Sequence, residues 1–252
     1  SAVSQGFTRD CTQHIIDPKY YNNHVEDLVT YSPAATFICV PTPQTDSGEA
    51  DVSIIISVLN YLKELNNHVV IIKSTVPAYR LSEFKEAYPT LRIVYNPEFL
   101  TEKNYIEDFK NPPMHVFGGD KIDTEWVEQL YKNHSVCNEC PIFHTDLVSA
   151  SFVKYSINSF LATKVTFFNE LYDVYRSAGG KDFDALTKII SNDPRVGSTH
   201  MQVPGNDGQR GYAGSCFPKD TSALAYFARE ILSTPFTQLE TSIKINNDLR
   251  KR

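Results

Sequence analysis

Short apolar runs alternate with helical stretches over the first two-thirds of this 252-residue chain, and this alternation limits the fold more than any other feature. Six runs rich in β-branched and apolar residues predict strands, at residues 14–17, 35–40, 68–73, 92–95, 115–117 and 141–144. Helical periodicity lies between them, at residues 52–64, 79–87 and 124–133. Strands that alternate with helices predict βαβ units, and hence a parallel sheet covered by helices on both faces.

The strand pattern stops near residue 145, and only helical patterns follow. Helices are predicted over residues 146–177, 182–191, 219–232 and 236–252. We therefore expect an α/β protein, with a Rossmann-like doubly wound parallel sheet followed by an all-α domain. The expected domains are residues 1–145, residues 146–234, and the start of a long connecting helix over 235–252.

The amino end of the chain resembles part of a dinucleotide-binding unit. Residues 1–7 resemble the inside of a helix, and the predicted strand over 14–17 ends in Asp17. In such a unit a Gly-rich turn precedes the helix, and an acidic residue at the end of the second strand binds a ribose. Asp17 fits that position, and we expect the first strand and its Gly-rich turn to be missing. The alternative is a turn carboxylate before Pro18.

Composition argues against several classes of protein, namely nucleic-acid-binding, membrane-spanning and disulfide-rich secreted proteins. The net charge of −6, without any run of Lys or Arg, argues against nucleic acid as a partner. No apolar stretch reaches membrane-spanning length, and no signal peptide is visible. Five cysteines without framework spacing indicate free thiols in a reducing compartment, which we take to be the cytoplasm. The single CxxC pair, Cys137 and Cys140, is interpreted as a loop coincidence, so no metal is expected.

The segment from Gly214 to Asp220 carries the strongest chemical signal, because it places a cysteine directly before a predicted helix. Pro218 suits the first helical turn, since it has no N–H to lose. A thiol at a helix N-terminus meets unpaired N–H groups and the positive end of the helix dipole, which favour the nucleophilic thiolate. Asp220, four residues after Cys216, is expected on the same face, where a carboxylate can orient a base or a water. The alternative is a buried structural cysteine.

Polar residues also follow several predicted strands, at the edge where open α/β sheets bind ligands. These segments are residues 40–43, 73–77, 96–102 and 144–146. Glu98 and Glu102 suit acid–base chemistry or hydroxyl binding, and helix capping is the alternative. On the long helix, Lys154 and Asn158 lie one turn apart and offer a cation and an amide donor, or form an ordinary surface pair.

Together these groups suit one reaction. A thiolate at Cys216 can capture an aldehyde, and Lys154 and Asn158 can hold the oxyanion that results. The carboxylates at strand ends supply groups for proton transfer. This combination, rather than any single residue, carries the interpretation.

Six segments in one order along the chain resemble the UDP-glucose/GDP-mannose dehydrogenase family, and most nearly its UDP-glucose 6-dehydrogenase group. They run through nearly the whole sequence, which makes the resemblance specific. The segments are FICVPTP (37–43), KSTVP (73–77), NPEFL (96–100), KYSINSFLATK (154–164), DPRVG (193–197) and GSCFPKD (214–220).

The resemblance implies a four-electron oxidation of a nucleotide sugar at C6, of the UDP-glucose to UDP-glucuronate type, with two NAD molecules used in turn. Cys216 would trap the intermediate aldehyde as a thiohemiacetal, and a second hydride loss would leave a thioester that water hydrolyses. Lys154 and Asn158 would hold the C6 oxygen. Asp220 would activate the water together with Thr75, and Glu98 is a candidate base in that step.

The resemblance also implies ligand contacts. Contacts to the UDP-sugar are expected from two loops and one arginine: Phe99, Leu100, Thr101, Glu102, Tyr212, Ala213 and Arg195. Contacts to NAD are expected from Asp17, Thr42, Thr75, Glu102 and Lys219. Arg195 resembles the family arginine that reaches the neighbouring subunit's site, so a homodimer through the helical domain is expected.

The sequence departs from the family in several places. The family continues into a second α/β domain that holds the uridine diphosphate, and we expect this chain to lack it together with the Gly-rich turn. Ala213, Ser151 and Lys103 replace a glycine, a common glutamate and a glycine. Two alternatives to an active dehydrogenase follow: a non-catalytic member that dimerises or binds nucleotide sugars, and a β-hydroxyacid-type dehydrogenase that transfers one hydride without a cysteine.

Overall fold

The computed structural model describes residues 2–17, 19–21, 24, 26–65, 68–101 and 103–251. It divides into two compact units. The first consists of Ser1–Pro43 with Asp51–Lys154, and the second consists of Gln44–Ala50 with Tyr155–Arg252. The first unit contains the sheet, and the second is built from helices and a long irregular segment.

The first unit contains a five-stranded sheet in the order of the chain. Its strands are β1 (Ala35–Ile38), β2 (Val69–Ile72), β3 (Arg92–Tyr95), β4 (His115–Gly118) and β5 (Ile142–Thr145). Parallel pairing joins β1 to β2, β2 to β3, and β4 to β5. The predicted Rossmann-like sheet is therefore confirmed as mostly parallel.

The junction between β3 and β4 departs from the predicted parallel ladder. It is a single antiparallel pair, Tyr95 opposite Gly118. A side-chain hydrogen bond replaces one of the missing backbone bonds between these strands. The Asn96 side-chain amide donates to the Val116 carbonyl oxygen over 3.0 Å. The buried carbonyl is thereby satisfied without a backbone partner.

The strand predicted over His14–Asp17 is wrong, because residues 11–17 are irregular. The Asp17 carbonyl oxygen accepts hydrogen bonds from the Tyr20 and Tyr21 amides, and the Asp17 carboxylate accepts one from the Lys19 amide. These bonds form a turn, so Asp17 lies in a turn and not at the end of a strand. Pro18 lies outside the described residues.

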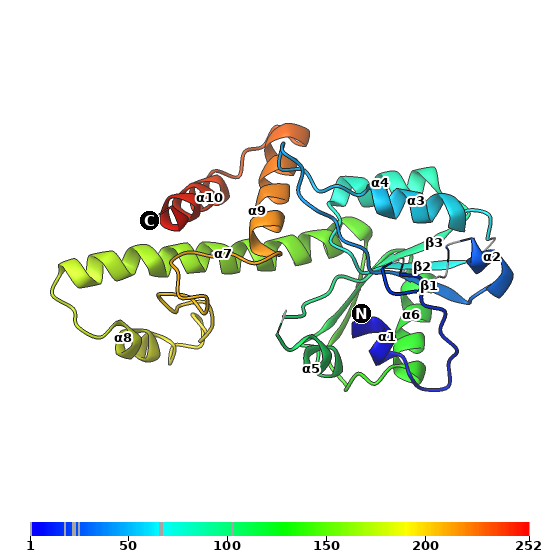
Figure 1. Cartoon of the computed structure of the whole chain (residues 1–252), viewed down its shortest axis with the longest axis horizontal. Coiled ribbons are helices and arrows are strands. Elements are labelled where there is room, and N and C mark those ends of the chain that lie inside the picture. The colour runs from blue at the N-terminus through cyan, green and yellow to red at the C-terminus, as the bar shows by residue number, and fades with distance from the viewer. Residues whose placement is uncertain are drawn as a thin grey trace. The chain divides into compact units, whose positions relative to one another are not determined.

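Helices cover both faces of the sheet, as a doubly wound fold requires (Figure 1). On one face, α3 (Ser53–Leu62), α4 (Ala78–Ala87) and the start of α7 (Leu147–Ser177) pack against Val70 and Ile72. On the other, α1 (Ala2–Gly6), α5 (Tyr105–Lys110) and α6 (Lys121–His134) pack against Val69 and Ile71. Successive residues of β2 point to opposite faces, which explains why this strand is entirely apolar. The short helix α2 (Asp27–Tyr31) adds Leu28 to the first core.

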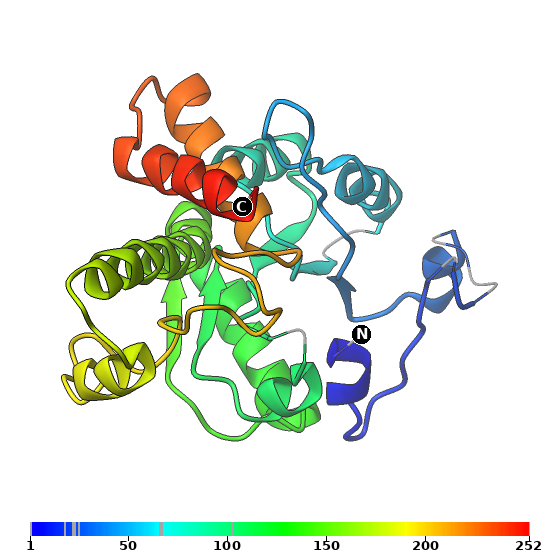
Figure 2. The same cartoon turned by 60° about the vertical axis from the view of Figure 1, so that its left-hand side comes forward.

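The second unit contains most of the long helix α7 and four shorter helical elements. These are α8 (Phe183–Ile190), α9 (Phe217–Tyr226), the π-helix η1 (Phe227–Ile231) and α10 (Thr237–Arg250). The predicted all-α part is confirmed, with bounds close to those expected. Phe168 of α7 packs with Phe183 of α8, Met201 and Val203, and α8 lies beside the second half of α7 (Figure 2).

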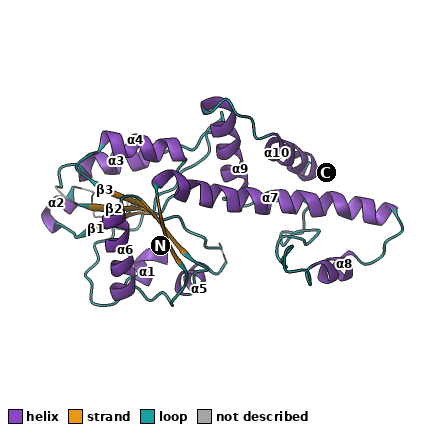
Figure 3. Cartoon of the chain, turned by 180° about the vertical axis from the view of Figure 1, so that it is seen from behind, coloured by secondary structure: helices purple, strands orange, loops and turns teal. Residues whose placement is uncertain are grey.

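Residues 191–216 connect α8 to α9 without any helix or strand, as the loop trace in Figure 3 shows. Such long irregular connections in compact units commonly have a functional role. A bilayer-crossing helix is not found in the described part of the chain.

Burial of His115 predicts a pH-dependent stability. The imidazole packs 4.6 Å from the Tyr131 ring, between centroids. Burial, and then the charge of Lys73, lower the pKa of His115 to about 4. The unfolded chain binds this proton near pH 6.5, so the free energy of unfolding should fall by about 3 kcal/mol as the pH falls from about 6.5 to about 4.

Urea unfolding of His115→Phe at several pH values tests this expectation. The variant should lose that part of the pH dependence relative to the unchanged protein, whereas a matched change of exposed His24 to Phe should leave it intact. Equal slopes for His115→Phe and the unchanged protein would contradict the expectation.

Candidate active site

Cys216 lies directly before α9, as the sequence predicted. It occupies the N-cap position, Pro218 is in the first turn, and the Asp220 amide donates to the Cys216 carbonyl oxygen over 2.8 Å. The cysteine is exposed and forms no disulfide. Its sulfur lies 3.6 Å from the Ser215 hydroxyl oxygen. An exposed thiol at this position excludes the alternative of a sealed structural cysteine.

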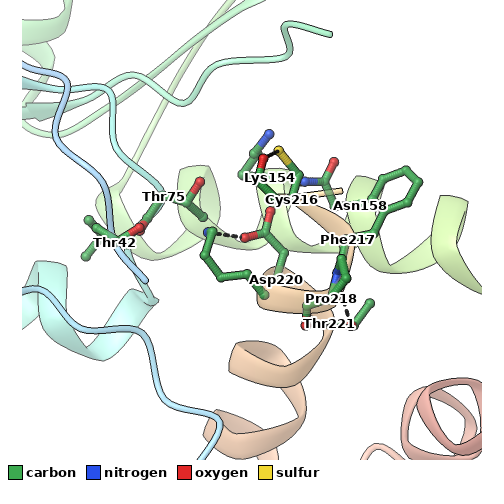
Figure 4. A network of polar contacts seen from close by, with 12 residues as sticks. Thr42, Thr75, Lys154, Asn158, Cys216, Phe217, Pro218, Asp220 and Thr221 are labelled. Atoms are coloured by element: carbon green, nitrogen blue, oxygen red, sulfur yellow. Dashed lines mark hydrogen bonds and ion pairs between the residues drawn. The ribbon is translucent and has the colours of Figure 1, made fainter. Parts of the chain in front are cut away.

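Asp220 lies one turn after Cys216 and is buried, with 1% of the residue exposed. Its carboxylate accepts a hydrogen bond from the Asn158 amide nitrogen over 2.5 Å and forms an ion pair with Lys219 (Figure 4). A buried carboxylate needs such donors, because an uncompensated charge in the interior is costly. The structure thus brings Cys216, Asn158 and Asp220 of the predicted set to the start of α9. Lys219, predicted to contact NAD, forms an ion pair with Asp220.

Lys154 is buried in the first unit, near the start of α7. Its ammonium group donates to the Glu98 carbonyl oxygen over 2.6 Å and lies 5.5 Å from the centre of the Phe99 ring. The loop after β3 is therefore tied to α7 through its backbone. The Glu98 carboxylate is partly exposed and lies 4.0 Å from the Lys73 ammonium group.

Lys73 forms a buried polar cluster that the sequence did not predict. Its ammonium group lies 2.9 Å from the Asn96 side-chain oxygen and 3.3 Å from the Tyr131 hydroxyl, which also donates to Asn96 over 2.6 Å. Burial lowers the pKa of Lys73 and raises that of Tyr131. The available signal was a lysine directly after four buried strand residues, a position where a cation must have partners.

The loops after β1 and β2 meet at the carboxyl edge of the sheet. The Thr42 hydroxyl donates to the Thr75 carbonyl oxygen over 3.0 Å, and the Ser74 hydroxyl donates to the Val40 carbonyl oxygen over 2.6 Å. These bonds bring together Thr42 and Thr75, both predicted to contact NAD.

The remaining predicted residues have different environments. Leu100 and Phe99 pack on the cores of the first unit, and the Thr101 amide and hydroxyl both donate to Asp108. Glu102 lies outside the described residues. In the second unit Tyr212 is buried and Ala213 is exposed. Arg195 is exposed and forms a bidentate pair with Asp193.

Metal ligation has no support within the described ranges, where no three His, Cys, Asp or Glu residues form a group that could hold an ion. The Cys137 thiol donates to the Phe109 carbonyl oxygen over 3.0 Å. All five cysteines are free. Cys137 and Cys140 form no disulfide.

Sequence patterns of known families match both units. Residues 21–135 match the NAD binding domain of the UDP-glucose/GDP-mannose dehydrogenase family, and residues 148–248 match its central domain. The chain belongs to this family. Its cofactor is therefore NAD.

Named relatives agree with this assignment. A UDP-glucose 6-dehydrogenase of Rickettsia bellii is 36% identical over 211 residues, covering 81% of this chain and 46% of the relative. One of Rhizobium meliloti is 36% identical over 248 residues, covering 91% of this chain and 54% of the relative. The chain thus spans about half the length of the curated relatives that it matches.

Solved structures show the same fold. A UDP-glucose dehydrogenase from Pyrobaculum islandicum has a TM-score of 0.77 at 27% identity, covering 89% of this chain and 52% of that chain. A UDP-D-ManNAc dehydrogenase from Pyrococcus horikoshii has a TM-score of 0.76 at 21% identity, covering 94% and 58%. The second supports the fold alone.

Several residues of the first unit fit NAD by their chemistry. The neighbouring ends of β1 and β2 present Thr42 and Thr75, joined by a hydrogen bond, at the edge where such sheets bind dinucleotides. The Asp17 carboxylate can accept hydrogen bonds from ribose hydroxyls, although it is at a turn rather than at a strand end.

Removal of the Asn158 amide should destabilise the second unit. Asn158→Ala leaves the buried Asp220 carboxylate with one donor fewer, which should lower the free energy of unfolding by about 1–3 kcal/mol. Urea unfolding at pH 7 measures the change. Ser156→Ala, at an exposed position of the same helix, is the matched control and should have little effect. Equal stabilities for the two variants would show that the amide does not compensate the carboxylate.

Proposed function

We propose that this chain forms the NAD-binding and central parts of a nucleotide-sugar dehydrogenase that oxidises C6 of a UDP-sugar, of the UDP-glucose to UDP-glucuronate type. The observation that carries the proposal is the exposed thiol of Cys216 at the start of α9, one turn before the buried Asp220 carboxylate. A nucleophilic thiol suits an oxidation in which an intermediate aldehyde is held for a second hydride transfer.

The proposed reaction has two oxidations and one hydrolysis. When bound, NAD would supply the hydride acceptor for each oxidation. The C6 alcohol would first lose a hydride and its hydroxyl proton to become an aldehyde. The Cys216 thiolate would then add to the aldehyde carbon, and the resulting oxyanion would take up a proton to form a thiohemiacetal. Loss of the second hydride leaves a thioester. Water then cleaves the carbon–sulfur bond, which yields the carboxylate and returns the thiol.

The proposed roles of the polar residues follow from their donors and acceptors. Lys154 and Asn158 would hold the C6 oxygen while negative charge develops on it. Asp220 would orient the hydrolytic water together with Thr75, and Glu98 would accept its proton.

The proposed ligand contacts complete this assignment. Asp17, Thr42, Thr75 and Lys219 would contact NAD, and Glu102 would contact both ligands. Substrate contacts would come from residues of the two loops, namely Phe99, Leu100, Thr101, Tyr212 and Ala213. We place the protein in the cytoplasm, which five free thiols support.

Replacement of Cys216 tests the reaction directly. The full chain with NAD and UDP-glucose should produce reduced cofactor, followed by its absorbance. Cys216→Ser should lower kcat by at least on the order of 10³-fold, because the aldehyde can no longer be trapped by a thiol.

The control is Cys11→Ser, which removes another exposed thiol and should leave turnover unchanged. Turnover that survives Cys216→Ser would favour a dehydrogenase that transfers a single hydride. Absence of turnover in every form, with nucleotide-sugar binding retained, would favour a non-catalytic member of the family.

A homodimer through the helical domain is also part of the proposal. Phe160, Phe167 and Val174 of α7 are 67%, 60% and 66% exposed. They recur every seven residues, so they form one apolar stripe along the helix. Large exposed side chains in such a stripe are typical of a protein interface. Arg195, with its exposed side chain, would then contact the substrate of the neighbouring subunit.

Charge on this stripe should break the dimer. The double variant Phe160→Asp with Phe167→Asp would place carboxylates in an apolar interface, so the mass from sedimentation velocity should fall to that of a monomer. The control is Ile122→Asp, at a position of α6 that is 72% exposed in the first unit. A dimer that survives the double variant would place the interface elsewhere.

A further inference from the structure

Two buried asparagines hold the irregular segment that leads to Cys216. Residues 191–216 contain no helix or strand, yet the backbone of Gly211 and Tyr212 is bonded by side chains from α7 and α10. We infer that Asn246 and Asn169 are positioning residues that fix this backbone and, through it, the substrate loop and the start of α9. The consequence for catalysis rests on the proposed function.

Asn246 of α10 binds both polar groups of one residue. Its side-chain oxygen accepts from the Tyr212 amide over 2.6 Å, and its side-chain nitrogen donates to the Tyr212 carbonyl oxygen over 3.1 Å. A neighbouring strand would supply the same two bonds. Asn246 is 5% exposed and Tyr212 is also 5% exposed, so water does not readily replace either partner.

Asn169 of α7 binds the preceding residues. Its side-chain oxygen accepts from the Gly211 amide and from the Arg210 guanidinium, each over 3.2 Å. Its side-chain nitrogen donates to the Val165 carbonyl oxygen over 2.9 Å, which fixes the orientation of the amide. Asn169 is 1% exposed. Consecutive backbone amides, those of Gly211 and Tyr212, are therefore each bonded by a different helix.

Gly211 is the residue that permits this approach. Its φ is +77°, a conformation that side chains disfavour, and a β-carbon there would lie 2.5 Å from the Asn246 side-chain oxygen. The absence of a side chain at Gly211 therefore lets the Asn169 and Asn246 amide groups approach the backbone of residues 211 and 212.

Two arginines strengthen the same contacts. The Arg250 guanidinium donates to the Tyr212 carbonyl oxygen over 3.2 Å and pairs with Asp207 over 2.7 Å. The Arg210 guanidinium makes two bonds to Asp173, over 2.9 and 3.0 Å. These pairs are partly exposed and contribute less than the buried amides.

Tyr212 connects this backbone to the helix that begins after Cys216. Its ring packs edge-to-face on Phe217, with centroids 6.0 Å apart. Only three residues separate Tyr212 from Cys216. A displaced Tyr212 backbone would therefore displace the first turn of α9 and the thiol at its N-cap.

Hydrogen exchange of the peptide covering residues 205–216 tests the contacts without any ligand. Asn246→Asp keeps the size and the acceptor but removes the donor, and Asn246→Ala removes both. Exchange of the Tyr212 amide should accelerate by about tenfold in the alanine variant. The control is Asn247→Ala, the exposed neighbour on the same helix, which should exchange like the unchanged protein.

Trypsin provides a second measurement, because it cleaves after Arg210 within this segment. Cleavage there should accelerate in both Asn246 variants relative to cleavage after Lys121, whose side chain is 84% exposed. If Asn246→Ala does not fold, as judged by circular dichroism, Asn246→Asp and Asn169→Asp replace it. Unchanged exchange and cleavage in folded variants would overturn the inference.

Kinetics separate a positioning role from a merely structural one. With NAD and UDP-glucose, Asn246→Asp should lower kcat by about tenfold and change the KM for NAD much less, because the proposed NAD contacts Asp17, Thr42 and Thr75 lie in the first unit. A folded variant with unchanged kcat would overturn the link to Cys216. If the unchanged protein shows no turnover, the proposed function fails, and exchange and cleavage alone still decide whether the two asparagines hold the segment.

Discussion

The buried carboxylate of Asp220 is the constraint on which the second unit depends. A carboxylate with 1% exposure needs close donors, and Asn158 of α7 and Lys219 of α9 supply them. This requirement fixes the start of α9 against the middle of α7. Because Cys216 is the N-cap residue of α9, the same requirement fixes the thiol at the surface.

The first unit has a buried cation in place of a buried anion. Lys73 lies between Asn96 and Tyr131 within an aromatic core, and Asn96 also satisfies the Val116 carbonyl oxygen. One polar cluster therefore joins the end of β2, the loop after β3 and α6. Through this cluster, the segments KSTVP and NPEFL, which are about 20 residues apart in the sequence, contact each other.

Much of the architecture could be predicted from the sequence, because burial sets its periodicity. The apolar runs of β2 to β5 and the patterns of α3, α4, α6 and α7 were identified within a few residues. The strand at His14–Asp17 was wrong, since a short β-like run does not reveal whether a partner strand exists. The helices α2 and α5 were missed because five or six residues give almost no periodic signal.

The candidate site could be predicted only in part. Cys216, Asp220 and Asn158 were identified by spacing and resemblance, and the structure places them together at the start of α9. The partners of the buried polar groups could not be predicted. The bonds of Lys154 to the Glu98 carbonyl oxygen, and of Asn169 and Asn246 to the backbone of Gly211 and Tyr212, depend on tertiary packing. Hydrogen bonds from a side chain to a distant backbone group produce no recognisable pattern in the sequence.

The attachment of α10 to the Tyr212 backbone has a mechanical consequence. Asn246 and Arg250 are one helical turn apart, so a rotation or shift of α10 along its axis would move both at once. Such a movement would be transmitted to Cys216, because only three residues separate it from Tyr212. A contact that displaces α10 would therefore also change the position of the Cys216 sulfur.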